Sequence, residues 1–154
     1  MLINIELTLE TEPAREDVAF LDQQINAYNF ETTGVREGGP LAYFLRGPDG
    51  EILAGLSGYT WGDCCDIRYL WVRADLRSRG QATQMLQAAE EEAARRGCCQ
   101  VVLDTHSFQA PEFYRKRGYE VVGVFENYPG EHRKFFLRKR LVPARSLEEG
   151  EEKP

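Results

Sequence analysis

The chain has 154 residues, of which 42% are hydrophobic and 11% aromatic, and it carries a formal net charge of −6 at pH 7. That length suffices for one domain with a hydrophobic core and is too short for two ordinary ones. The acidic balance argues against sequence-independent binding of nucleic acid. No run approaches the ~18 to 20 consecutive apolar residues that span a membrane, and the N-terminus does not resemble a signal peptide, so we expect a cytoplasmic protein.

The first part of the chain predicts a strand, a helix and a hairpin. Leu2 to Leu9 alternates apolar and polar residues as a strand does. Between Glu12 and Phe30 the apolar residues recur at helical spacing, which predicts a helix. Two strand-like runs then flank Pro48-Asp49-Gly50, a turn signal that predicts an antiparallel hairpin.

The second part predicts strand, helix, strand, short helix and hairpin. An apolar strand from Cys64 to Val72 leads into a helix that begins at about Arg79 and stops at Gly97. Uniformly apolar residues predict a buried strand from Cys98 to Thr105. A short helix follows at Ala110 to Gly118, and the runs "YEVVGVFEN" and "HRKFFLRKRL" predict a final hairpin.

The C-terminal segment differs in composition from the rest. The sequence "ARSLEEGEEKP", which follows Pro143, has four glutamates and almost no apolar content. Such a segment cannot offset the entropy of ordering its backbone. We therefore expect one domain over residues 1–142 and a disordered acidic tail over residues 143–154.

The four cysteines form two adjacent pairs, Cys64-Cys65 and Cys98-Cys99. Neighbouring residues in a strand point to opposite faces, so these pairs lack the spacing of zinc ligands. The chain has only two histidines. We therefore expect free thiols and no metal site.

The turn before the predicted helix at Arg79 has the features of an anion site. The first N–H groups of a helix lack intrahelical partners, and the helix dipole adds about half a positive charge there. Gly80 would let a ligand approach the backbone closely, while Arg77 and Arg79 add charge. These features suit a pyrophosphate, although two arginines at a helix start are also typical of an ordinary solvated surface. The phosphate loop of nucleotide hydrolases and the three-glycine dinucleotide fingerprint are both absent.

Two motifs resemble signatures of the GCN5-related N-acetyltransferase (GNAT) superfamily. Arg77-Ser78-Arg79-Gly80-Gln81-Ala82 is similar to its Arg/Gln-x-x-Gly-x-Gly/Ala signature, and Phe113 to Gly123 resembles its second signature. The resemblance covers roughly Leu2 to Leu141. It implies an α/β (α+β) fold: a mixed, mostly antiparallel sheet of six to seven strands, splayed between its fourth and fifth strands and flanked by about four helices.

The resemblance also implies acetyl-CoA as the co-substrate, held in the splay with its pyrophosphate on the helix N-terminus. Leu70 and Val72 would present backbone groups to the pantetheine arm, and a backbone N–H of Leu70 or Trp71 would meet the thioester oxygen. The residues implied in coenzyme binding are Leu70, Trp71, Val72, Arg77, Ser78, Arg79, Gly80, Gln81, Ala82 and Thr83.

Acetyl transfer to an amine also needs a way to protonate the departing thiolate and to deprotonate the amine. The resemblance places Tyr114 at the coenzyme A sulfur, although a tyrosine packed in the core is the alternative interpretation. Asp66, with Asp63 near it, and His106 are candidates for the proton acceptor. His106 could equally be a hydrogen-bonded histidine at a strand end.

The acceptor is expected to be a primary amine of a small molecule or protein, attacked directly in a ternary complex, since no cysteine has an evident base beside it. The alternative is an inactive module that binds acyl-CoA. We expect no nucleic-acid or membrane partner, and a homodimer is compatible with the sequence. Aromatic residues expected to wall the acceptor pocket are Tyr28, Phe30, Tyr59, Trp61 and Tyr128.

Overall fold

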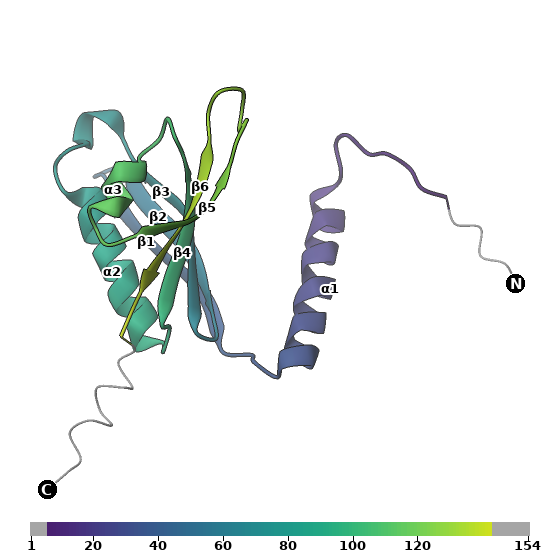
Figure 1. The fold of residues 1–154 in the computed structure, drawn as a ribbon. Helices are drawn as coiled ribbons and strands as arrows, with labels where there is room; N and C mark the ends of the chain where they lie inside the picture. The colour runs from purple at the N-terminus through teal and green to yellow at the C-terminus, as the bar shows by residue number, and fades with distance from the viewer. Residues whose placement is uncertain (1–5, 143–154) are drawn as a thin grey trace, which may run out of the picture. The chain divides into compact units, whose positions relative to one another are not determined.

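The computed structural model describes residues 6–142, which divide into two compact units, one up to Arg36 and one from Glu37 onward. The first unit holds helix α1 (Arg15–Thr33), which confirms the helix predicted there (Figure 1). Gly34 ends the helix in the left-handed conformation at φ 70°, and its N–H donates to the Phe30 carbonyl at 2.9 Å. Within the described residues, no helix is both long and apolar enough to cross a membrane.

The strand predicted over Leu2 to Leu9 is wrong for the part that the structure describes. Residues 6–9 have no regular secondary structure, and Leu7 and Leu9 are 99% and 86% exposed. Alternating residues become a strand only where a neighbouring strand accepts their backbone hydrogen bonds, and no strand in the described part of the chain pairs with residues 6–9. Residues 2–5 and the predicted acidic tail lie outside the described residues.

Six strands of the second unit form one sheet in the order β1-β2-β3-β4-β6-β5 (Figure 1). All neighbours are antiparallel except β3 and β4, so the predicted mixed, mostly antiparallel sheet is confirmed. The structure describes three α-helices, one fewer than expected. The elements are β1 (Gly38–Arg46), β2 (Ile52–Trp61), β3 (Cys64–Val72), η1 (Ala74–Leu76), α2 (Gln81–Arg95), β4 (Gln100–His106), α3 (Pro111–Arg115), β5 (Glu120–Phe125) and β6 (Lys134–Arg140).

Helix α2 packs on one face of β1, β2 and β3. Its buried residues Met85, Ala89 and Ala93 recur every four positions and so form one stripe along the helix. The two alanines are fully buried, and their small side chains let the helix lie close to the sheet. This packing fixes the direction in which the helix N-terminus points.

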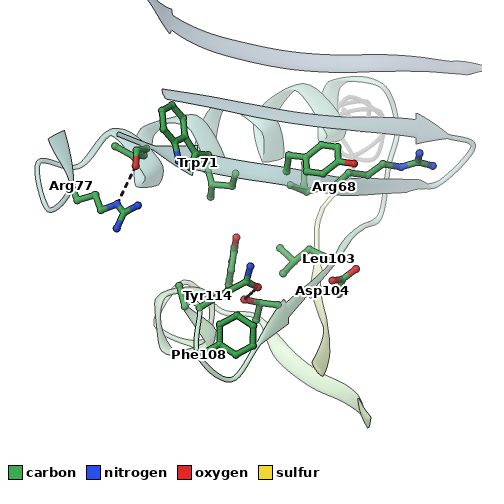
Figure 2. Close-up of a pocket in the computed structure, with 14 residues that line it drawn as sticks. Arg68, Trp71, Arg77, Leu103, Asp104, Phe108 and Tyr114 are labelled. Atoms are coloured by element: carbon green, nitrogen blue, oxygen red, sulfur yellow. Dashed lines mark hydrogen bonds between the residues drawn. The ribbon is translucent and has the colours of Figure 1, made fainter. Parts of the chain in front are cut away.

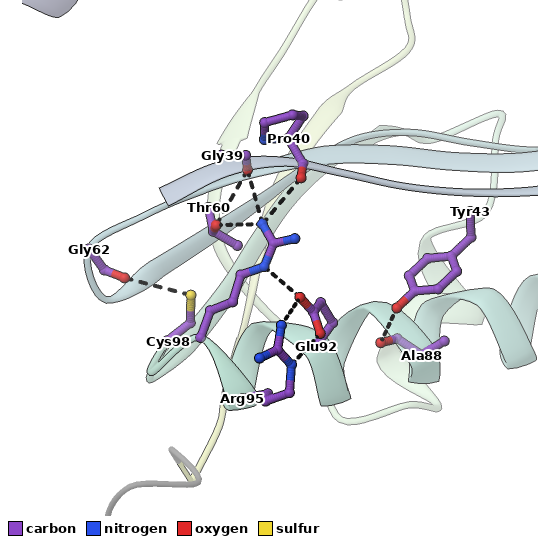
Figure 3. Close-up of polar contacts among 10 residues, drawn as sticks. Gly39, Pro40, Tyr43, Thr60, Gly62, Ala88, Glu92, Arg95 and Cys98 are labelled. Carbon is purple, nitrogen blue, oxygen red and sulfur yellow. Dashed lines mark hydrogen bonds and ion pairs between the residues drawn. The ribbon is translucent and has the colours of Figure 1, made fainter. Parts of the chain in front are cut away.

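Polar contacts hold the other end of α2 to the sheet (Figure 3). Arg96 donates from Nη1 to Thr60 Oγ1 at 3.0 Å and to the carbonyls of Gly39 and Pro40, both at 3.2 Å. Its Nε pairs with Glu92 Oε1 at 2.7 Å. The half-buried guanidinium therefore satisfies carbonyls from β1 and a buried hydroxyl from β2 at once, which makes the C-terminal end of α2 rigid.

Strands β3 and β4 separate partway along their length. They pair only from Cys64 to Ile67 and from Gln100 to Leu103, although both strands continue beyond. At the same point β3 carries a bulge at Arg68, because Ser57 pairs with Tyr69 while Gly58 pairs with Ile67. The strands that separate are the predicted fourth and fifth, so the expected splay is confirmed.

Gly58 permits the bulge. A Cβ on Gly58 would lie 2.4 Å from the Asp66 carbonyl oxygen, which no side chain can do. The glycine thus lets β2 approach the distorted part of β3 closely.

Candidate functional site

A cavity of about 600 Å³ fills the wedge between β3 and β4 (Figure 2). Beyond Ile67 the edge of β3 that faces β4 has no strand partner, so its free backbone groups border this space. Arg68 and Trp71 come from β3, Leu103 and Asp104 from β4, and Tyr114 from α3. The complete lining consists of residues 67–72, Arg77, residues 103–105, Phe108, Gln109, Ala110 and Tyr114.

A second cavity, of about 410 Å³, lies against the N-terminus of α2. Leu70, Val72, Arg77, Ala110 and Tyr114 line both cavities, so the two spaces adjoin. The remaining residues that line the second cavity come from η1 and the turn after it, from the start of α2, and from α3 and the segment that follows it: Leu76, Ser78, Gly80, Gln81, Ala82, Thr83, Phe113 and Arg117. A long, narrow ligand could therefore run from the helix N-terminus into the wedge.

The helix N-terminus offers free donors to this cavity. Helix α2 begins at Gln81, two residues later than predicted, and the first intrahelical bond runs from the Gln84 N–H to the Gly80 carbonyl at 3.0 Å. In the described part of the chain, the amides of Gln81, Ala82 and Thr83 find no acceptor. They are the donors that a bound anion would satisfy.

The turn conformation keeps the approach to these amides open. Gly80 has φ 90° and Ser78 has φ 61°, so two of three successive residues adopt the left-handed region. A Cβ built on Gly80 would have nothing within 4 Å, so open space lies above this backbone. A ligand can therefore reach the helix end without meeting a side chain at Gly80.

Three arginines without a carboxylate partner surround the same point. No ion pair among the described residues involves Arg77, Arg79 or Arg117, whereas Arg73 pairs with Asp75 at 2.7 Å. Arg77 donates from Nε to the Val72 carbonyl at 3.1 Å, and Arg79 is exposed beside the helix start without lining either cavity. In a chain of net charge −6, this local excess of cations favours an anionic ligand.

The second cavity also contains an unsatisfied acceptor. Gln81 Oε1 is buried and lacks a hydrogen-bond partner among the described residues. A buried carbonyl without a partner costs free energy, so a ligand N–H or O–H at this place would stabilise it. Coenzyme A carries two amides on its pantetheine arm and a pyrophosphate, and the donors, cations and acceptor found here fit both groups.

Tyr114 joins the two cavities. It is 8% exposed, and its ring packs edge-on against those of Phe113 and Tyr119. Its side chain points into the space between β3 and β4 (Figure 2). Among the described residues, the tyrosine hydroxyls of Tyr43 and Tyr119 donate hydrogen bonds, whereas the Tyr114 hydroxyl has no partner. Burial, with a smaller contribution from the charge of Asp104, raises the pKa of Tyr114 to about 12, so the phenol keeps its proton at neutral pH.

The structure places the two predicted proton acceptors away from the lining of the wedge. Asp66 lies on β3 before the bulge and is 3.7 Å from the Arg68 guanidinium. His106 Nδ1 lies 3.0 Å from Gln109 Oε1, and its ring stacks on Phe108 at 5.1 Å. Only Phe108 and Gln109 of that group reach the cavity.

The predicted acceptor walls fall in three places. Tyr28 and Phe30 belong to α1 in the first unit, where Phe30 packs 5.7 Å from the Arg36 guanidinium. Tyr59 and Trp61 lie on β2, opposite Asp66 and Cys64. Tyr128 lies in the final hairpin, and its ring is tilted against that of His106 with the ring centres 5.4 Å apart.

Several lining residues were missed by the sequence analysis. Asp104 is the carboxylate that borders the wedge, and it pairs with Lys134 at 3.1 Å. Arg117 borders the second cavity although it follows α3, far along the chain from the first signature. Asp104 directly follows Leu103, the last residue of β4 that pairs with β3. It is the one acidic residue in the apolar run from Cys98 to Thr105, and that is the sequence signal that could have identified it.

Comparisons with known proteins agree with this geometry. A family model described as "Acetyltransferase (GNAT) family" matches residues 4–119. The chain is 33% identical over 113 residues to blasticidin-S acetyltransferase of Streptomyces morookaense, which covers 71% of this chain and 83% of that protein. A crystal structure of an acetyltransferase from Bacillus cereus is 31% identical, with a TM-score of 0.72 over 87% of this chain and 98% of that one.

An aminoglycoside 6′-N-acetyltransferase solved with coenzyme A shares the fold, with a TM-score of 0.60 at 19% identity over 82% of this chain and 86% of that one. The fold, both signatures and the matched family model lead to one conclusion. The chain belongs to the GNAT family of acetyltransferases.

Proposed function

We propose that this protein transfers the acetyl group of acetyl-CoA to a primary amine by direct attack in a ternary complex. One observation carries the proposal: free amides, unpaired guanidinium groups and the unpartnered Tyr114 hydroxyl border two adjoining cavities. The named relatives are acetyltransferases, and one structure of the same fold contains coenzyme A. Acetyl-CoA supplies an activated thioester to such a site.

The α2 N-terminus would bind the pyrophosphate through the amides of Gln81, Ala82 and Thr83. The Gln81 side-chain carbonyl would accept from a pantetheine amide. The unpaired edge of β3 would offer a backbone N–H, of Leu70 or Trp71, to the thioester oxygen.

Tyr114 would act on the leaving sulfur mainly as a hydrogen-bond donor. Its pKa of about 12 lies above the ~8.5 of an ordinary thiol, so complete proton transfer would be uphill by about 5 kcal/mol. A donor that keeps its proton can nonetheless stabilise negative charge as it develops on the sulfur.

For the proton of the attacking amine, the structure favours Asp104 over the two candidates expected from sequence. Asp104 lines the wedge cavity, whereas Asp66 and His106 do not. Its carboxylate lies at the border of the cavity, 3.1 Å from the Lys134 ammonium, where an acidic group would attract an ammonium group before attack.

The test is release of free thiol from acetyl-CoA in the presence of single amines. The panel should include blasticidin S, because a relative 33% identical is named for it, together with an aminoglycoside and an acetyl-free peptide N-terminus. We expect thiol release with at least one amine and its loss in Gly80→Asp, which places a carboxylate at the pyrophosphate position. Binding of acetyl-CoA without thiol release on any amine would favour an inactive binding module instead.

A further inference from the structure

A third cavity, of about 320 Å³, continues from the coenzyme site past the first turn of α2. Thr83 and Arg117 line both this cavity and the one at the helix N-terminus, so they mark the boundary between the two spaces. The other lining residues of the third cavity are Leu86, Gln87, Glu90 and Lys139. Any ligand anchored by its pyrophosphate at α2 would have this cavity beside it.

Arg117 is held rigidly at the boundary. It donates from Nε to Thr83 Oγ1 at 3.1 Å, from Nη2 to the same oxygen, and from Nη1 to the Phe113 carbonyl at 2.7 Å. Its guanidinium also lies 3.7 Å from the centre of the Phe113 ring. These contacts place the charge in one orientation before any ligand arrives.

The contacts leave donors free. A guanidinium carries five N–H groups, and three of them are used in the bonds to Thr83 and Phe113. Because Thr83 Oγ1 accepts from Arg117, the hydroxyl proton of Thr83 is left to donate elsewhere. One residue therefore offers two N–H groups and orients a neighbouring O–H.

Three charged side chains line the third cavity: Glu90, Arg117 and Lys139. Among them, Arg117 is the cation without a carboxylate partner in the described part of the chain. Lys139 Nζ lies 2.6 Å from Glu90 Oε2, and Tyr119 donates to Glu90 Oε1 at 2.9 Å. That carboxylate is thus neutralised by its own partners, whereas no ion pair among the described residues involves Arg117. A half-buried cation without a counter-ion is a place for an anion.

Coenzyme A carries a third phosphate, a monoester on the 3′ position of its ribose, in addition to the pyrophosphate. Resting on the function proposed above, we infer that Arg117, with the Thr83 hydroxyl, binds this 3′-phosphate and makes the protein select coenzyme A over 3′-dephospho-coenzyme A. Arg77 and the α2 amides border the cavity assigned to the pyrophosphate, which both compounds share. Selection between them therefore isolates the part played by Arg117.

The test is calorimetric titration of the full chain with coenzyme A and, separately, with 3′-dephospho-coenzyme A. For the wild type we expect coenzyme A to bind about 10- to 100-fold more tightly, the range for charge-assisted hydrogen bonds to one phosphate. In Arg117→Gln the two affinities should become equal within about threefold. In the matched control Arg77→Gln both affinities should fall while their ratio stays that of the wild type, because Arg77 lines the pyrophosphate cavity and not the third one.

The ratio separates recognition from packing, because a merely structural loss at Arg117 weakens both ligands alike. Equal wild-type affinities, or an unchanged ratio in Arg117→Gln, would overturn the inference and leave the proposed function intact. Failure of the wild type to bind either compound would instead refute the proposed function. If Arg117→Gln does not fold, Thr83→Val tests the same role: removal of the oxygen that anchors Arg117 should reduce the ratio, and a wild-type ratio in that variant would contradict the inference.

Discussion

Replacing Tyr114 by Phe removes one hydroxyl from the junction of the two cavities. The ring is 8% exposed and packs against Phe113 and Tyr119, and phenylalanine preserves those contacts. The hydroxyl has no partner among the described residues, so its loss leaves no protein group unsatisfied. We therefore expect the free energy of unfolding at pH 7 to change by less than about 0.5 kcal/mol.

The effect on turnover should be much larger. Loss of one donor aimed at developing charge costs roughly 10²- to 10³-fold in kcat, which is about 3 to 4 kcal/mol. The Michaelis constant for acetyl-CoA should stay within about threefold, because the hydroxyl acts on the sulfur only as charge develops there. The assay is thiol release at saturating acetyl-CoA, with the amine that the wild type accepts best.

Tyr119→Phe is the matched control, since the two rings lie 5.7 Å apart. The Tyr119 hydroxyl donates to Glu90 at 2.9 Å, so its removal should cost about 1 kcal/mol of stability and leave kcat within about threefold. A Tyr114→Phe enzyme that keeps kcat within threefold of the wild type, or two variants with equal losses, would refute the role given to Tyr114.

Three further predictions concern the turn and the titrating groups. Gly80→Ala should lower the free energy of unfolding by about 1 to 2 kcal/mol, because φ is 90° there, and should weaken coenzyme A binding in calorimetry; unchanged affinity would contradict close approach of the ligand. The pKa of Tyr114 is about 12 in the folded protein and about 10 in the unfolded chain, so the folded protein holds more protons between these pH values and its stability falls as pH rises through them. In urea titrations at a series of pH values, Tyr114→Phe should remove about 2 to 3 kcal/mol of that fall. The same loss of stability with pH in the variant and the wild type would count against burial of the phenol. Hydrogen bonds from Arg95 and Arg96 lower the pKa of Glu92 to about 2, so stability should decline as pH falls from about 4.5 to 2. Glu92→Gln should flatten that decline. The same decline in the variant and the wild type would show that the contacts of Glu92 with the two arginines add no stability.

The sequence predicted most of the sheet because its signals are local. The Pro48-Asp49-Gly50 turn and the apolar run from Cys64 to Val72 correspond to β1, β2 and β3. The predicted strand at Leu2 to Leu9 failed in its described part because alternation reports only which faces are apolar, whereas a strand also needs a partner edge. The bulge at Arg68 left no local signal, since it depends on the absence of a Cβ at Gly58 on the neighbouring strand.

The candidate site likewise contains some residues that the sequence could predict and others that it could not. The helix start at Gly80 could be identified because its glycine and flanking arginines adjoin in sequence. Arg117 could not, because its role arises from a hydrogen bond to Thr83, which is 34 residues away. Gln109 likewise folds back onto the Thr105 hydroxyl and the His106 backbone N–H through a turn that composition does not specify. Side chains that act across elements need the fold before their function can be inferred.

The central claim is that the free amides at the start of α2 bind the pyrophosphate of coenzyme A. A crystal structure of the protein with coenzyme A tests it most directly. We predict pyrophosphate oxygens about 2.7 to 3.2 Å from the backbone nitrogens of Gln81, Ala82 or Thr83, with the pantetheine arm running toward Tyr114. A pyrophosphate bound elsewhere, with those amides facing only solvent, would contradict the claim.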